Sequence, residues 1–186
     1  MNYMNPNNFN SLVDLFLHQV EKEKSQEIFL EWLNPVNRRR FTWSETASNV
    51  YKFAKTLKNY IKDGDRVLLV SENRPEWLIS DIAIMMSGGI TVPAYTTYTD
   101  KDYDYLIKDC EPTVVIVSNN TLFKKLKNAI NTSNFIKIII AFDSISISDS
   151  EKKYLDFDSI IKSNLLEKDK IKEINLKRTS PACIIY

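Results

Sequence analysis

The stretch Arg66–Tyr95 constrains the fold more than any other part of the chain. It opens with a short apolar run, Arg66–Ser71, of the kind that forms a fully buried strand in a parallel sheet. Residues 76–87 are apolar nearly all round, which predicts a helix that is buried on most sides. A second short apolar run follows at Ile90–Tyr95. A strand, a helix and a strand with short joints predict a right-handed βαβ unit with parallel strands.

The joints of this unit have structural explanations. Asn73 is expected to accept hydrogen bonds from the free N–H groups at the helix start, and Pro75 suits a first helical turn. Gly88-Gly89 is expected to end the helix, where a residue with an unusual backbone angle is common. Because the C-terminal end of a helix repels anions, this glycine pair is not expected to hold a phosphate group.

The alternation of strands and helices continues after this unit. Helices are expected at Asp100–Asp109 and directly after Asn119 or Thr121, either of which can cap the second helix. Strands are expected at Thr113–Val117 and Phe135–Phe142. Such alternation predicts an α/β fold with a three-layer, mainly parallel, doubly wound sheet that carries helices on both faces.

The N-terminal part predicts a helix and a short hairpin. Residues 1–10 are rich in Asn and are expected to be disordered. A helix is expected from Ser11, and Ile28–Leu33 and Arg39–Trp43 predict two strands joined by a turn. The tetrapeptide Thr42-Trp43-Ser44-Glu45 is a capping box, which predicts that the next helix starts there.

The C-terminal part is more polar. Residues 143–153 are polar and Ser-rich and predict a surface loop, and short helices are expected at Phe157–Lys162 and Leu165–Lys170. Ala182–Tyr186 predicts a further buried strand, in which Cys183 would behave as a small hydrophobic residue. No change in composition suggests a second domain, so residues 1–186 are expected to form a single unit.

Composition and charge exclude several classes of protein. Lys and Arg number 25 and Asp and Glu number 24, so the overall charge does not indicate a nucleic-acid partner. Cys110 and Cys183 fit no metal or redox spacing, which favours a reducing, cytoplasmic location. The start of the chain lacks the pattern of a signal peptide, and the longest apolar helix is too short to span a bilayer. Peripheral membrane contact stays open.

Few side chains are candidates for chemistry. The three glycines form neither a GxGxxG nor a GxxxxGK turn, so the two common phosphate loops are absent. His18 is the only histidine, and no nucleophile accompanies it in the sequence. Asp100, Asp102 and Asp104 lack the glycine and terminal glutamate of a calcium loop, so they are interpreted as charges at a helix start. We therefore predict no catalytic residue and no metal ligand.

Several motifs resemble those of long-chain acyl-CoA synthetases, members of the adenylate-forming (AMP-binding) superfamily. The segments SENRPEW and GGITVPAY, at residues 71–77 and 88–95, carry the resemblance. Phe41–Glu45 resembles the first core motif of the superfamily, and Met85–Tyr95 resembles the second. Ser180–Tyr186 looks like the strand that leads into the third motif, a phosphate-binding loop expected at the next residue. The chain is thus similar to an incomplete N-terminal subdomain of such an enzyme.

The resemblance implies an enzyme that activates a fatty acid with Mg²⁺ and ATP as an acyl-adenylate and then transfers the acyl group to CoA. In the family, the phosphate loop, the nucleotide-binding motifs and the catalytic lysine lie beyond the position that matches Tyr186. The chain alone is therefore expected to be inactive and to bind none of these cofactors tightly, while contributing walls to the acyl and CoA channels.

The same resemblance implies the expected partners. They are the fatty acid substrate and either a missing C-terminal portion or a second copy of the chain. Residues 182–186 are then expected to expose apolar area. A non-catalytic binding or interaction module is the alternative. A complete nucleotide-binding enzyme of another doubly wound family is disfavoured, because the phosphate loop is missing.

Two basic clusters could contact phosphate. In related acyl- and acetyl-CoA synthetases, basic residues in about this region approach the phosphates of CoA, which makes Lys124, Lys125 and Lys127 candidate contacts for CoA. A solvated helix face is the simpler interpretation of these lysines. For the run Arg38-Arg39-Arg40, a solvated strand edge is favoured over a phosphate site.

Overall fold

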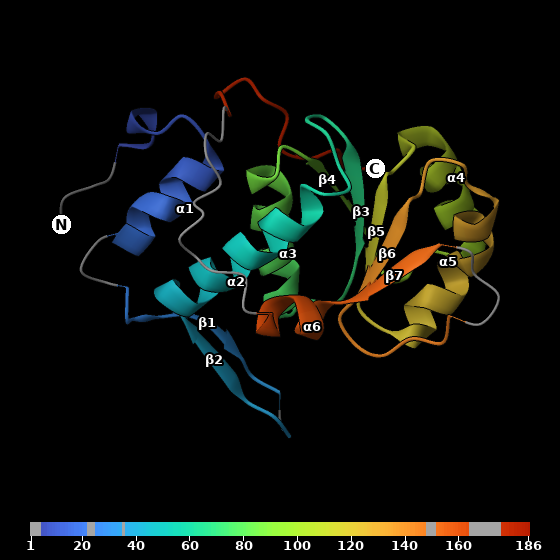
Figure 1. The fold of residues 1–186 in the computed structure, drawn as a ribbon, viewed down its shortest axis with the longest axis horizontal. Helices are drawn as coiled ribbons and strands as arrows, with labels where there is room; N and C mark the ends of the chain where they lie inside the picture. The colour runs from blue at the N-terminus through green and yellow to red at the C-terminus, as the bar shows by residue number, and fades with distance from the viewer. Residues whose placement is uncertain (1–4, 22–24, 35, 148–151, 164–175) are drawn as a thin grey trace.

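The computed structural model describes residues 5–21, 25–34, 36–147, 152–163 and 176–186, and its centre is a five-stranded parallel sheet (Figure 1). The strands are β3 (Arg66–Val70), β4 (Ile90–Ala94), β5 (Val114–Val117), β6 (Ile138–Ala141) and β7 (Lys153–Asp156). They lie in the order β4-β3-β5-β6-β7, and every neighbouring pair is parallel. The first strand of this sheet in chain order, β3, is therefore an internal strand. β4 lies on one side of it, and β5, β6 and β7 follow in turn on the other side.

Helices cover both faces of the sheet, which confirms the predicted doubly wound architecture. One face carries α2 (Trp43–Leu57), α3 (Pro75–Met86) and α6 (Phe157–Lys162), and the other carries α4 (Asp100–Cys110) and α5 (Asn120–Thr132). Along β3, Val67 and Leu69 face the first core, whereas Leu68 and Val70 face the second. Burial on both faces explains why the central strands are continuously apolar. In the described part of the chain, no helix is long and apolar enough to cross a membrane.

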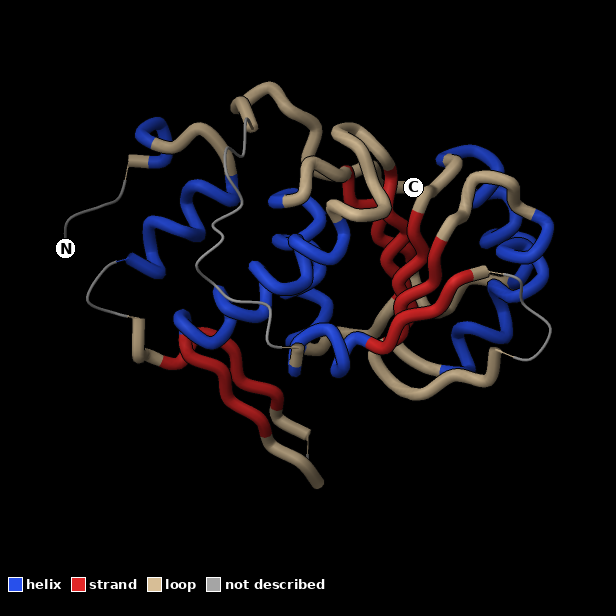
Figure 2. The backbone as a smooth tube through the Cα atoms, viewed as in Figure 1, coloured by secondary structure: helices blue, strands red, loops and turns tan. Residues whose placement is uncertain are grey.

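The hairpin and the capping box are confirmed at the N-terminal end. After a short 3₁₀ turn and α1 (Leu12–Glu21), β1 (Ile28–Trp32) pairs with β2 (Arg39–Thr42) in antiparallel fashion and projects from the body (Figure 2). The Thr42 hydroxyl accepts a hydrogen bond from the Glu45 N–H, and the Glu45 carboxylate accepts one from the Thr42 N–H. The expected disorder of residues 1–10 stays a prediction.

Two helix starts differ from the expectation or decide between alternatives. Asn73 does not cap α3: the N-cap is Arg74, whose side chain makes no capping hydrogen bond, and Pro75 occupies the first turn. The prediction was wrong by one residue, because a proline at the first helical position places the N-cap on the residue before it, which is Arg74. Asn119, rather than Thr121, caps α5 through the Leu122 N–H.

The strand β7 was not predicted. The polar pattern of residues 143–153 suggested a loop, but Lys153–Asp156 pairs with β6 at the edge of the sheet. An edge strand of four residues carries polar side chains on its exposed positions, so it lacks the apolar run that marks the central strands. The helix expected at Leu165–Lys170 lies outside the described residues.

The C-terminal segment forms only a bridge to the sheet, not the predicted strand. The Thr91 N–H donates to the Ala182 carbonyl at 3.1 Å, and the Ile184 N–H donates to the Thr91 carbonyl at 2.9 Å. Cys183 is exposed, so the prediction of a buried thiol was wrong. A segment with one neighbour presents alternate side chains to solvent, and Ile185 is 73% exposed.

Candidate functional site

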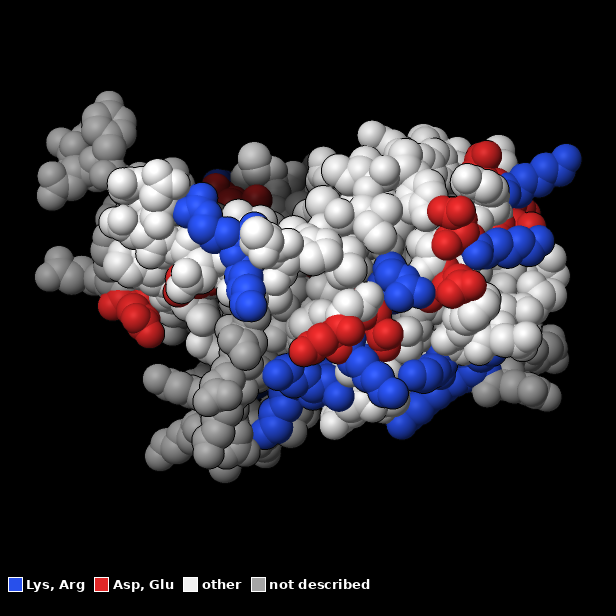
Figure 3. Space-filling model, turned by 90° about the horizontal axis from the view of Figure 1, so that it is seen from above, with Lys and Arg blue, Asp and Glu red and all other residues white. Residues whose placement is uncertain are grey.

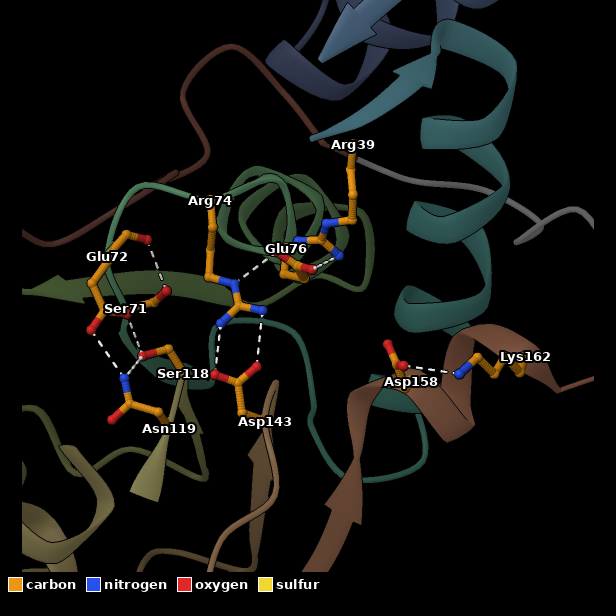
Figure 4. A network of polar contacts seen from close by, with 10 residues as sticks. All are labelled: Arg39, Ser71, Glu72, Arg74, Glu76, Ser118, Asn119, Asp143, Asp158 and Lys162. Carbon is orange, nitrogen blue, oxygen red and sulfur yellow. Dashed lines mark hydrogen bonds and ion pairs between the residues drawn. The ribbon is translucent and has the colours of Figure 1, made fainter. Parts of the chain in front are cut away.

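The loops that follow the parallel strands gather at one edge of the sheet, which is the usual ligand-binding edge of such folds. The crevice in doubly wound sheets forms where the strand order reverses, and here that point lies between β3 and β5. Ser71 and Glu72 follow β3, Ser118 and Asn119 follow β5, and Asp143 follows β6. Figure 4 shows the polar contacts that these residues make.

Side chains of the protein itself bridge the crevice between β3 and β5. The Glu72 carboxylate accepts hydrogen bonds from the Ser118 hydroxyl at 2.5 Å and from the Asn119 side-chain amide at 3.0 Å (Figure 4). Burial alone would raise the pKa of Glu72, but these hydrogen bonds outweigh it and lower the pKa, so the group is ionised at neutral pH. The bridging carboxylate would repel a phosphate group placed there.

A second set of contacts joins the hairpin, α3 and the loop after β6. Arg74 donates two hydrogen bonds to Asp143, at 3.0 and 3.1 Å, and its Nε donates to Glu76 at 2.8 Å (Figure 4). The other oxygen of Glu76 pairs with Arg39 Nη1 at 2.6 Å. Arg39 comes from β2, so this buried ion network connects the hairpin with the edge of the sheet.

The buried carboxylate of Glu76 is the centre of this network. Its side chain is 6% exposed. Burial by itself would raise the pKa of Glu76, but the hydrogen bonds from Arg74 and Arg39 lower it. The two arginines and the two carboxylates, Glu76 and Asp143, balance in charge, which fits a structural role better than a catalytic one.

An open cavity lies on the other side of β3, next to β4. Its volume is about 470 Å³, within the range of small-molecule sites. The walls are mainly apolar and aromatic, and Glu72 and a few hydroxyl and amide groups provide the polar part. The lining residues are Ser71, Glu72, Asn73, Trp77, Pro93, Ala94, Tyr95, Thr96 and Ile185.

Two side chains hold the loop that forms one wall of this cavity. The Lys125 ammonium donates to the carbonyl oxygens of Thr96 and Tyr98, each at 3.1 Å. The Tyr103 hydroxyl donates to the Tyr95 carbonyl at 2.7 Å. Both contacts use backbone oxygens, so they fix the path of the loop independently of its side chains.

The three candidate lysines therefore differ in their surroundings. Lys124 is exposed on α5, Lys127 is half-buried, and Lys125 is bonded to the loop after β4. A contact of these lysines with CoA stays a prediction. On the face shown in Figure 3, basic and acidic side chains are intermixed.

Other candidates from the sequence lie apart from this edge. His18 packs against the ring of Phe9, with ring centroids 5.0 Å apart. Asp102 completes a capping box with Thr99, and Asp104 pairs with Lys108, as expected for charges at a helix start. Within the described residues, no group of three or more His, Cys, Asp or Glu side chains could hold a metal ion.

Sequence reasoning missed the residues that shape the site. Glu72, Arg74, Glu76 and Trp77 all lie in the segment SENRPEW, which was interpreted as a strand end and a helix start. One signal was available: three charged residues directly follow a buried strand, where only the ligand-binding edge or solvent can accommodate them.

Comparisons with known proteins agree with the fold. The family model described as "AMP-binding enzyme" matches residues 16–186. A long-chain-fatty-acid–CoA ligase of Bacillus subtilis is 28% identical over 134 residues, which are 72% of this chain and 22% of the relative. Long chain acyl-CoA synthetase 3 of Arabidopsis thaliana is 26% identical over 197 residues, covering 97% of this chain and 28% of the relative. The chain thus spans about a quarter of the length of these relatives.

One solved structure shows the same fold at low identity. The anthranilate CoA ligase AuaEII, determined in complex with anthranoyl-AMP, superposes with a TM-score of 0.70 and 19% sequence identity. The superposition covers 85% of this chain and 28% of that protein. The five-stranded sheet and its helices therefore correspond to one part of a larger architecture.

Proposed function

Because the chain belongs to the AMP-binding enzyme family, we propose that it is the N-terminal part of a ligase that activates a long-chain fatty acid with ATP and transfers the acyl group to CoA. The names of the Bacillus subtilis and Arabidopsis thaliana relatives support the long-chain substrate class. The fold by itself does not specify a substrate, so the proposal depends on the cavity next to β4.

The role of this chain in the proposed ligase is to form a wall for the uncharged acyl chain of the substrate. The observation that carries this role is the composition of the cavity: Trp77, Pro93, Tyr95 and Ile185 offer apolar surface, whereas Glu72 is ionised. A carboxylate or phosphate group would meet repulsion from Glu72, but a hydrocarbon chain would gain from leaving water. The reacting carboxyl group is then expected to lie outside the cavity.

The residues of this chain do not fit ATP or Mg²⁺. The sequence has no glycine-rich phosphate turn, and the Glu72–Ser118 contact bridges the crevice where other doubly wound sheets hold a nucleotide. We therefore propose that adenylation needs residues that this chain does not contain.

The proposed CoA contact requires a distinction among the three lysines. Lys125 is engaged by the carbonyls of Thr96 and Tyr98, so Lys124 is the better candidate for a phosphate group of CoA. A complete ligase with Lys124, Lys125 and Lys127 all replaced by Glu should show a raised Michaelis constant for CoA, and an unchanged constant would contradict the contact.

The test of the proposed function uses the chain as it is. Titration with palmitate should change the tryptophan fluorescence of a variant in which Trp77 is the only tryptophan (W32F/W43F) and release heat in calorimetry, whereas acetate and pantetheine should do neither. Mixing the chain with ATP, Mg²⁺ and palmitate should release no pyrophosphate. Binding of pantetheine but not of palmitate would show that the cavity holds part of CoA instead of the acyl chain. Pyrophosphate release above the blank would contradict the proposal that this chain cannot catalyse adenylation.

A non-catalytic binding module is the second candidate. The polar groups at the β3–β5 crevice have partners within the chain, and both hydrophobic cores are buried. A stable monomer that melts cooperatively and ignores palmitate would favour this candidate. Conversely, the exposed residues Ile184, Ile185 and Tyr186 support a covering partner, either a C-terminal portion or a second copy of the chain. A cytoplasmic site of action is part of the proposal.

A further inference from the structure

The β1–β2 hairpin is anchored at its base and on its inner side. The rings of Phe29 and Trp43 stack with centroids 3.7 Å apart, and Arg39 pairs with the buried Glu76 at 2.6 Å. The far end of the hairpin stands away from the body of the molecule (Figures 1 and 2). The outer ends of β1 and β2 therefore project from a base that is packed and ion-paired to the body of the molecule.

Two large apolar side chains are exposed at this end. Leu33 is 71% exposed and Val36 is 95% exposed. Asn34 accepts hydrogen bonds on its side-chain oxygen from the N–H groups of Val36, at 2.9 Å, and Asn37, at 3.1 Å. The side chain of Asn34 thus bonds to backbone groups of its near neighbours, and the side chain of Val36 stays in solvent.

Two arginines next to this end are only partly neutralised. The Nε atoms of Arg38 and Arg40 both donate to the same oxygen of Glu31, each at 2.6 Å. Hydrogen bonds from Arg40 and Arg38 lower the pKa of Glu31, so it carries one negative charge against two positive charges. The side chains of Arg38 and Arg40 stay more than half exposed, at 55% and 53%. Arg39 lies on the opposite face of β2, where it forms the ion pair with Glu76.

We propose that this end of the hairpin, defined by Leu33, Val36, Arg38 and Arg40, contacts the surface of a membrane that contains anionic lipids. Exposed apolar side chains flanked by arginines can enter the boundary between headgroups and acyl chains while the charged groups stay at the phosphates. Each basic residue near such a surface strengthens binding about fivefold. This contact does not depend on the substrate of the proposed ligase.

Two other occupants are less consistent with these residues. A nucleic acid would use the arginines but would gain nothing from Leu33 and Val36. A protein partner would not depend on the charge of a lipid surface. The apolar and charged groups together therefore favour the lipid surface, and both alternatives can be distinguished by experiment.

The test is sedimentation of the whole chain with vesicles of phosphatidylcholine alone or with about 30% phosphatidylglycerol, at low and high salt. The chain should bind the anionic vesicles at least about fivefold more tightly than the neutral ones. The double substitution R38Q/R40Q should weaken binding about 25-fold, which is about fivefold for each arginine, and L33S/V36S should weaken it by about tenfold or more. Circular dichroism should show the same fold for all variants, because the four side chains are exposed.

Matched controls make the test specific to the hairpin. K101Q/K137Q removes the same two positive charges from exposed positions elsewhere, and Phe135→Ser removes an exposed apolar side chain elsewhere. Both should bind anionic vesicles as the unchanged chain does. Equal losses in the controls, or equal binding to neutral and anionic vesicles, would overturn the proposal. It would also be overturned if L33S/V36S bound normally, because the site would then be a general polyanion contact.

Discussion

The two halves of the carboxyl edge of the sheet differ in how their polar groups are satisfied. Between β3, β5 and β6, Glu72 bonds to Ser118 and Asn119, and Arg74 bonds to Glu76 and Asp143. Next to β4, the edge is hollow, and its walls are mainly apolar. The difference shows that a doubly wound sheet can bridge its usual nucleotide crevice with its own side chains and keep an open cavity one strand away.

The largest effect on stability is expected in the part of the edge between β3, β5 and β6, when one of its ion pairs is broken. Replacing Glu76 by Ala leaves Arg39 and Arg74 in a largely buried environment without their shared acceptor. Loss of one partner from such a buried network should lower the free energy of unfolding by about 3–5 kcal/mol, measured by urea denaturation.

The control for this change is Asp158→Ala, which removes an exposed ion pair with Lys162 on α6 (Figure 4). Exposed pairs of this kind contribute little, so the urea midpoint should stay the same. Equal shifts for the two variants would show that the buried ion network has no special importance.

A smaller effect on stability is expected from Lys125, which holds the loop beside the cavity. Lys125→Met removes the donor to the Thr96 and Tyr98 carbonyls and should cost about 1–3 kcal/mol of stability. The matched variant Lys124→Met, one residue away and exposed, should leave stability unchanged. Protease cleavage in the loop after β4 should rise in the first variant only, and cleavage in both would contradict a specific clamp.

The aromatic wall of the cavity should affect palmitate binding, although Trp77 also packs against the first core, so binding is compared at a temperature where the variant is folded. Trp77→Ala removes a half-buried ring from the cavity and should weaken palmitate binding about tenfold, as measured by calorimetry. Tyr105→Ala removes an exposed ring that does not line the cavity and should have no effect on binding. If both variants bound palmitate equally well, the acyl chain would have to lie elsewhere.

The smallest effects concern pH. The pKa of Glu72 is below its ordinary value of 4.5, so the folded chain binds this proton less tightly than the unfolded chain. Glu72 therefore stabilises the fold above about pH 4.5, and this contribution is lost as the pH falls. Glu72→Gln should reduce the dependence of the urea midpoint on pH in this acid range. An unchanged dependence would show that the hydrogen bonds of Glu72 with Ser118 and Asn119 do not stabilise the fold.

Asp81 on α3 should behave in the opposite way. Burial raises the pKa of Asp81 above its ordinary value of 3.8, so its ionisation disfavours the folded state as the pH rises above that value. Asp81→Asn should therefore be neutral or stabilising at neutral pH. A clear loss of stability would show that the hydrogen bond from the Thr91 side chain outweighs the cost of burying the charge.

Local patterns in the sequence predicted most of the fold. The capping box at Thr42 and the buried runs of β3 and β5 are signals within a few residues, and all three are confirmed. By contrast, β7 has no local apolar run, since an edge strand of four residues is partly solvated.

The candidate site could not be predicted in the same way, because its contacts join distant positions. Arg74 and Asp143 are 69 residues apart, and Lys125 and Thr96 are 29 apart. Only the sheet order β4-β3-β5-β6 brings the loops that carry these residues to one edge. Sequence reasoning selected Lys125 for its charge, but its two carbonyl partners depend on the packing of α5 beside the loop after β4.

Backbone amide NMR of the chain titrated with palmitate tests the central claim most directly, because it reports on both halves of the edge at once. We predict chemical-shift changes for Trp77, Thr96 and Ile185, which line the cavity. The amide shifts of Ser118, Asn119 and Asp143 should not change, because these residues do not line the cavity. Shift changes confined to Ser118, Asn119 and Asp143 would show that palmitate binds at the β3–β5 crevice and not in the cavity next to β4.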